Sequence, residues 1–246
     1  MKIKVVLSYD GTNFSGYQVQ PQKRTVQLEL EKALTTISKR DVKVVASGRT
    51  DAGVHAKGQV IHFNTDLTME DWQWVRALNA LLPGDILVRE VSCVNEQFHA
   101  RYDVLGKEYR YFVNTANHVN VFHRNYEAHY RGDINVILMR EAALSIIGTH
   151  DFSSFCASKT SVEDKVRTVE SITIIENGDI LEFRFVGNGF LYNMVRILVG
   201  TLLEFGSGKR NSNEMVTILN ACDRTKAGKT APAQGLFLWE VWYKQN

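Results

Sequence analysis

A repeated order of strands and helices is the feature that most constrains the fold. Hydrophobic periodicity predicts the order β-α-β-β-α-β twice along the chain. In the first copy we expect strands at 3–9, 42–46, 59–64 and 86–94 and helices at 26–37 and 72–82. In the second copy we expect strands at 108–115, 168–176, 180–186 and 236–243 and helices at 137–147 and 191–205. The sequence therefore predicts two related α/β halves.

Each half has the element order of a ferredoxin-like unit. The N-terminal half spans 1–105 and the C-terminal half spans 106–246, with the boundary near 100–107. Asn177 and Gly178 favour a tight hairpin between two strands of the second half. No proline-rich linker divides the halves, so we expect them to pack tightly, either as separate domains or through one shared sheet.

Composition favours a soluble globular protein. The 246 residues are 44% hydrophobic and 23% charged, which is enough to bury a sizeable core. The start of the chain has too short an apolar run for a signal peptide, and no stretch approaches the roughly 18 apolar residues of a membrane span. Three widely spaced cysteines predict neither a disulfide framework nor a thiolate zinc site. We expect a cytoplasmic protein with no membrane association.

The charge is only mildly basic. A net charge of +2 does not by itself require a polyanionic partner. Several cations nevertheless lie in loop-like sequence, where they are free to reach phosphates: Lys209, Arg210, Arg224, Lys226 and Lys229. For any single one of these, a solvated surface position is the commoner outcome.

Two other classes of site are disfavoured. The segment 223–230 ends like a phosphate-binding loop, but Asp223 replaces its first glycine and no clear strand precedes it. His118, His123 and His129 do not fit a zinc-binding spacing. We therefore expect neither nucleotide hydrolysis nor a metal site.

The most informative segment is GRTDAGVHA at 48–56, between two predicted strands. Glycines on both sides of Asp51 permit backbone turns that other residues resist, so Arg49, Asp51 and His55 lie on a constrained loop. Asp51 either caps a turn, the commoner role, or acts as a base or nucleophile held ionised by a nearby arginine.

This segment closely resembles the catalytic segment of the tRNA pseudouridine synthase A family. Further segments match in the same order along nearly the whole chain: YDG at 9–11, FSGYQ at 14–18, LPGDI at 82–86, FHAR at 98–101, YRY at 109–111, HDFSSF at 150–155, FLYNMVR at 190–196 and GLFL at 235–238. Tyr17 stands where many relatives have Trp, and either aromatic fits a core position. The resemblance implies an α+β pseudouridine synthase fold, in which the two ferredoxin-like halves join into a large mixed, mainly antiparallel sheet with helices packed on it.

The resemblance also implies roles for five residues. Asp51 is then the catalytic nucleophile, and Arg196 pairs with its carboxylate. Arg49 is associated with RNA entry and with holding the target base flipped out. Tyr109 packs on the target uracil, and Leu236 lines the base pocket.

Three of these roles can be weighed against an ordinary structural role for the same residue. Arg196 lies in an otherwise apolar helix, where a buried arginine is costly without a carboxylate partner. The flat face of Tyr109 replaces the stacking that a flipped base loses, although Tyr109 also fits a strand core. Leu236 fits a strand core equally well.

The implied reaction converts uridine to pseudouridine at positions 38, 39 and 40 in the anticodon arm of tRNA. The family further implies a homodimer, with no metal and no organic cofactor. Whether Asp51 attacks C1′, adds to C6 or removes a sugar proton stays open. Two alternatives remain: a non-catalytic tRNA-binding protein on the same fold, and a nucleosidase that releases free uracil.

Overall fold

A computed structural model describes residues 1–158, 162–211 and 213–244. The chain forms two compact units. The first unit is Met1–Leu105 together with the segment from Phe237 onward, and the second is Gly106–Leu236. Both units combine helices with a sheet, so the α+β class is confirmed.

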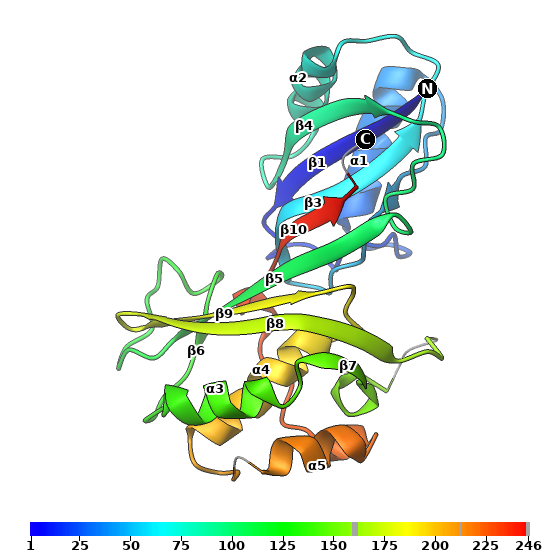
Figure 1. The fold of residues 1–246 in the computed structure, drawn as a ribbon. Coiled ribbons are helices and arrows are strands. Elements are labelled where there is room, and N and C mark those ends of the chain that lie inside the picture. Colours follow the sequence, from blue (N-terminus) through cyan, green and yellow to red (C-terminus); the bar gives the residue numbers. More distant parts are fainter. Residues whose placement is uncertain (159–161, 212, 245–246) are drawn as a thin grey trace. The chain divides into compact units, whose positions relative to one another are not determined.

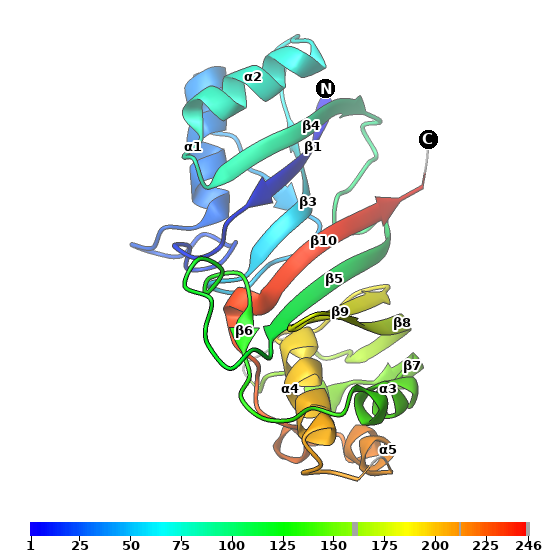
Figure 2. The ribbon, with the colours of Figure 1, turned by 90° about the vertical axis from the view of Figure 1, so that its left-hand side faces the viewer.

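In the first unit, two helices lie on one face of a mixed sheet (Figures 1 and 2). The strand order is β4, β1, β3, β10, and β2 pairs with β3. The elements are β1 (Lys2–Tyr9), α1 (Val26–Ser38), β2 (Val45–Ala46), β3 (His55–Asn64), α2 (Asp71–Leu81), β4 (Ile86–Val94) and β10 (Leu236–Tyr243). β1 pairs antiparallel with β3 and β4, whereas β10 pairs parallel with β3.

The core of this unit follows from alternation along β1. Ile3, Val5 and Leu7 are buried, while the residues between them are partly exposed, as expected for a strand with one covered face. On the covered side, the ring of Trp74 from α2 meets Phe63 of β3 edge to face, with centroids 5.3 Å apart. The sheet therefore has one helix-covered face and one open face.

The second unit also builds a mixed sheet with its helices gathered on one side (Figure 1). The strand order is β5, β9, β8, β7, and β6 pairs parallel with β5. The strands are β5 (Val104–Asn114), β6 (Ala128–His129), β7 (Gly148–Asp151), β8 (Val166–Asn177) and β9 (Ile180–Gly187). The helical elements are α3 (Val136–Leu144), η1 (Ser153–Phe155), α4 (Met194–Gly206), α5 (Glu214–Asn220), η2 (Arg224–Lys226) and η3 (Ala233–Gly235).

The twelve predicted helices and strands are all found, with changes at their ends. The strand predicted at 42–46 shortens to the two residues of β2. The helix predicted from residue 191 begins only at Met194, because Asn193 before it adopts a left-handed φ of 61°. The predicted hairpin is confirmed, with Gly178 at φ 59° between β8 and β9. Among the described residues, no helix has both the length and the apolar character needed to cross a membrane.

Candidate functional site

The GRTDAGVHA segment forms the loop between β2 and β3 and the first two residues of β3, so His55, expected on the loop, begins the strand. At its centre, the Val54 N–H donates to the Asp51 carbonyl oxygen at 3.1 Å, which closes a four-residue turn. Gly53 is the third residue of this turn and has φ 75°. A positive φ at that position is what a type II turn requires, and glycine adopts it without steric cost. Asp51 is thus fixed at the start of a tight turn.

The chain that leaves β1 fastens this loop through its backbone. The Tyr17 N–H donates to the Thr50 carbonyl at 3.0 Å, and the Gly53 N–H donates to the Phe14 carbonyl at 3.3 Å. The two loop residues that these bonds hold, Thr50 and Gly53, lie on either side of Asp51 in the sequence. The matching segments at 9–18 and 48–56 are therefore two stretches of backbone that support one another.

A buried polar network lies beneath the first half of the loop. The hydroxyl groups of Tyr9 and Thr50 are 2.7 Å apart, and the Gln59 amide donates to the Gly48 carbonyl at 3.0 Å. Ser47 in turn donates its hydroxyl to the Gln59 side-chain oxygen at 2.7 Å. Burial raises the pKa of Tyr9 to about 12, so its hydroxyl stays protonated. The loop thus has a rigid polar base.

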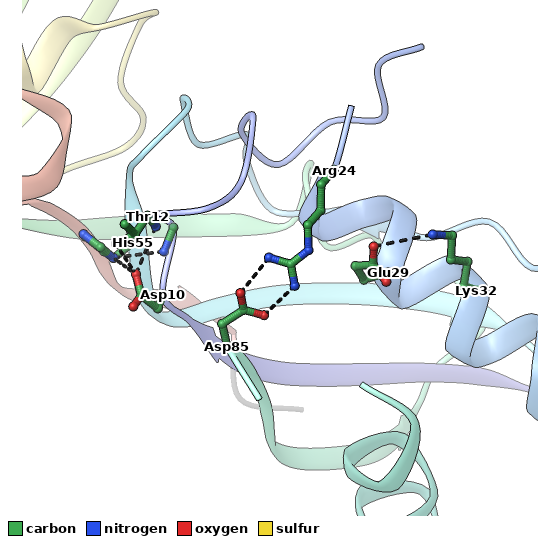
Figure 3. A network of polar contacts seen from close by, with 8 residues as sticks. Asp10, Thr12, Arg24, Glu29, Lys32, His55 and Asp85 are labelled. Carbon is green, nitrogen blue, oxygen red and sulfur yellow. Dashed lines mark hydrogen bonds and ion pairs between the residues drawn. The ribbon is translucent and has the colours of Figure 1, made fainter. Parts of the chain in front are cut away.

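His55 anchors the second half of the loop (Figure 3). Its Nδ1 accepts the Gly11 N–H at 2.9 Å, which places the proton of a neutral imidazole on Nε2. The same nitrogen lies 3.2 Å from Asp10, whose carboxylate already accepts two hydrogen bonds from Thr12. The ring stacks on Phe237, with centroids 4.6 Å apart. In the described structure, His55 therefore holds the chain around Gly11 next to the end of the Asp51 loop.

A bidentate ion pair fixes the start of β4 to the segment before α1 (Figure 3). The Arg24 guanidinium donates to both carboxylate oxygens of Asp85, at 2.7 and 2.8 Å. It also lies over the ring of Phe14, 4.1 Å from the centroid. Because Phe14 carries the carbonyl that holds Gly53, this pair supports the Asp51 loop indirectly.

Arg49 lies on the same loop, two residues before Asp51. Its side chain is exposed, whereas Thr50 between the two is buried. An exposed arginine beside a partly exposed carboxylate is able to meet a polyanion arriving from solvent.

The second unit carries the other predicted site residues. Tyr109 lies on β5, opposite Phe185 of β9, and its ring meets Phe190 edge to face with centroids 5.2 Å apart. Leu236 follows η3 and is 5% exposed. Both are therefore well-packed side chains.

Arg196 lies in the first turn of α4. It is held by the backbone of Ala231, a residue that sequence analysis does not single out. Its Nε donates to the Ala231 carbonyl at 2.8 Å, and the Ala231 N–H donates back to the Arg196 carbonyl at 3.0 Å. A second guanidinium nitrogen donates to the Asn193 side chain at 2.9 Å. Arg196 therefore has a defined orientation.

Glycines allow the segment around Ala231 to approach α4 closely. A Cβ atom on Gly200 would lie 1.8 Å from the Lys229 carbonyl oxygen, so only glycine fits there. The stretch that resembles a phosphate-binding loop is thus a support for α4. Its main signal in the sequence is the frequency of small residues, with Ala227, Gly228, Ala231 and Ala233 close together.

The described residues contain no group of three or more His, Cys, Asp or Glu side chains arranged to hold a metal ion. Asp51 and Arg49 belong to the first unit, and Tyr109, Arg196 and Leu236 belong to the second.

Comparison with known proteins identifies the family. The family model described as tRNA pseudouridine synthase matches residues 5–103 and 142–244. The chain is 58% identical over 243 residues to tRNA pseudouridine synthase A of Anoxybacillus flavithermus, covering 98% of each protein. It is 56% identical over 245 residues to tRNA pseudouridine synthase A of Bacillus subtilis, covering 99% of each. The chain belongs to the tRNA pseudouridine synthase family.

Proposed function

We propose that the chain converts uridine to pseudouridine in the anticodon stem-loop of tRNA, at positions 38, 39 and 40, with Asp51 as the nucleophile. The observation that carries this proposal is the placement of Asp51 on a turn whose backbone is fastened on both sides. Preorganised placement of a reacting group contributes a large share of catalytic power. Membership of the tRNA pseudouridine synthase family supports the reaction class and the tRNA substrate.

The reaction is an isomerisation. The bond between N1 and C1′ breaks, the uracil turns while held in place, and C5 bonds to C1′. C5 gives up its proton and N1 gains one, so no atom is lost overall. Attack of Asp51 on C1′, its addition to C6 and its removal of a sugar proton all need an ionised carboxylate close to the nucleoside. All three also need a pocket that excludes water.

The other predicted site residues act around this carboxylate. Arg196 stabilises the charge of Asp51, and Tyr109 packs on the uracil. Leu236 lines the pocket, and Arg49 enters the RNA helix to hold the base out. A base inside a stem is inaccessible until it flips, so a residue that fills the gap is required.

We further propose that the protein acts in the cytoplasm as a homodimer on the anticodon arm. The open face of the first unit's sheet supports a second copy as partner. Leu87 and Leu105 are 55% and 50% exposed along a hollow on this face. The hollow mixes cations such as Lys4 with acids such as Glu90, which suits a copy of the same chain better than a polyanion. Leu87→Glu should lower the mass measured by light scattering.

The decisive test is Asp51→Asn with tRNA labelled with tritium at C5 of uridine. The variant should release no tritium above background while still binding tRNA. Asp41→Asn, which changes an exposed carboxylate ten residues earlier, serves as the matched control and should keep full activity. Substantial turnover by Asp51→Asn would refute the assignment.

Product analysis separates the alternatives. Pseudouridine within intact tRNA supports the synthase. Free uracil identifies a nucleosidase, and binding without either product by the wild type identifies a non-catalytic protein.

A further inference from the structure

The loop between β5 and β6 in the second unit ends in an apolar tip. Phe122 is 86% exposed, the highest value for any large hydrophobic side chain in the part of the chain that the structure describes. Val119 and Val121 beside it are 48% and 57% exposed. A phenyl ring left in water contributes none of the free energy that its burial would supply, and a cluster of exposed apolar side chains often marks a contact site. The tip is therefore a candidate contact surface.

This tip has a defined shape. The side chain of Asn120 accepts the Phe122 N–H at 3.0 Å, and its carbonyl accepts the His123 N–H at 3.1 Å. The next turn is closed by the Tyr126 N–H, which donates to the His123 carbonyl at 2.8 Å. Asn at the start of such a turn fixes the backbone locally. The ring is thus presented by an ordered loop.

The base of the loop is tied to the strand that carries Tyr109. The Asn114 side chain donates to Glu127 at 2.6 Å, and His129 lies 2.8 Å from the Ala116 carbonyl. β6 extends this anchorage by pairing in parallel with the end of β5. The loop that carries the tip is therefore attached to the strand that carries Tyr109.

The charge around the tip has one sign. Glu127 is the only acid between residues 115 and 132, and it is 8% exposed. The exposed charged side chains of this stretch are Arg124 and Arg131, and the imidazole rings of His118 and His123 are exposed as well. An exposed aromatic ring among cations is what binds unpaired RNA, because the ring stacks on a base while the cations meet phosphates. A second copy of the chain would need acids here to complement these cations.

We propose that Phe122 stacks on an unpaired base of the RNA substrate, other than the target uridine, and that Arg124 contacts a neighbouring phosphate. This inference rests on the proposed tRNA substrate and names a second point of contact with it. The unpaired bases of the anticodon loop are of the kind that such a ring binds.

The test compares Phe122→Ala, Phe122→Leu and Phe122→Trp for binding to unmodified tRNA. Loss of one stacked base should raise the Kd about tenfold for Ala. Leu lacks an aromatic face and should behave like Ala, whereas Trp should bind as tightly as the wild type. Trp72→Ala is the matched control, since Trp72 is 62% exposed on α2 beside the acids Glu70 and Asp71, and it should leave the Kd unchanged.

The salt dependence of tRNA binding distinguishes the phosphate contact of Arg124 from the base stacking of Phe122. Arg124→Ala should reduce the slope of log Kd against log salt by about 1, whereas Phe122→Ala should shift the Kd and leave the slope unchanged.

The proposal is overturned if Phe122→Ala binds like the wild type, or if Phe122→Leu retains full affinity. It is also overturned if Phe122→Ala changes the mass measured by light scattering, because the ring then serves a protein interface. A wild type that binds tRNA but forms no pseudouridine would defeat the proposed function alone. The binding comparison of the Phe122 variants would still stand.

Discussion

The hydroxyl groups of Tyr9 and Thr50 lie 2.7 Å apart in the interior of the first unit. Thr50 is the residue directly before Asp51. Tyr9 is 4% exposed and Thr50 is 7% exposed, so neither hydroxyl can exchange this partner readily for water. The bond joins the end of β1 to the loop that carries the proposed nucleophile. This hydrogen bond therefore helps to hold Asp51 in place.

Tyr9→Phe should impair catalysis more than binding. It leaves the Thr50 hydroxyl buried without its partner, which costs about 1–3 kcal/mol of folding free energy. A small displacement of Asp51 should lower kcat about tenfold or more while KM changes little, because misplacement affects the reacting geometry. Steady-state kinetics and thermal melting measure the two effects.

Tyr17→Phe is the control for this prediction. Within the described residues, the Tyr17 hydroxyl is buried and has no hydrogen-bond partner, while its backbone N–H holds Thr50. Removing that hydroxyl should leave kcat unchanged and should not lower stability. Equal losses of kcat in both variants would show that the Tyr9 bond has no special role.

Gly53→Ala should lower both stability and activity. Gly53 has φ 75°, and an alanine there costs about 1 kcal/mol or more. Gly178→Ala is matched to it, because Gly178 has φ 59° in the β8–β9 turn and an alanine Cβ there would meet no atom within 4 Å. Both variants should melt at lower temperature, and only Gly53→Ala should lose pseudouridine formation. Full activity of Gly53→Ala would contradict a role for the turn in placing Asp51.

Local signals make much of this molecule predictable. The alternation along β1 and the helical spacing along α1 are properties of short windows, so periodicity locates both elements. The glycines around Asp51 likewise indicate a turn from the sequence alone. Each of these features is determined by residues that are close together in the sequence, so a short window of sequence is enough to predict it.

Contacts between distant segments are not predictable in the same way. β10 is predicted as the last strand of the second half, and the structure pairs it with β3 of the first unit, where Phe237 aligns with His55. Periodicity shows that a segment is a strand and not which strand it joins. The contact between Ala231 and Arg196 was missed for the same reason, because an alanine carbonyl has no signature in the sequence.

Arg196→Lys should reduce activity although it keeps the positive charge. The Arg196 Nε–H donates to the Ala231 carbonyl and another nitrogen donates to Asn193, and a lysine cannot reproduce this fork. We expect kcat/KM to fall about tenfold or more, measured by tritium release. Arg210→Lys is the control, since Arg210 pairs with Glu204 at 2.6 Å at the other end of α4. Similar losses in both variants would argue that Arg196 only stabilises the helix.

His62 should make the stability of the first unit sensitive to mild acid. The ring is 6% exposed, and its Nδ1 accepts the Ala100 N–H at 3.0 Å. Burial, with smaller contributions from His99 and Lys2, lowers the pKa of His62 to about 4. An unfolded histidine has a pKa of about 6.5, so between these values the unfolded chain binds a proton that the folded chain does not.

The stability contributed by neutral His62 should therefore be complete above about pH 6.5 and should fall as the pH drops toward 4. Between pH 7 and pH 5 the loss should reach at most about 2 kcal/mol. His62→Gln keeps an acceptor for the Ala100 N–H but cannot titrate, so its melting temperature should fall less over this range. His118→Gln changes an exposed histidine and should melt with the pH dependence of the wild type. If His62→Gln and the wild type lose the same stability, another group governs the acid response.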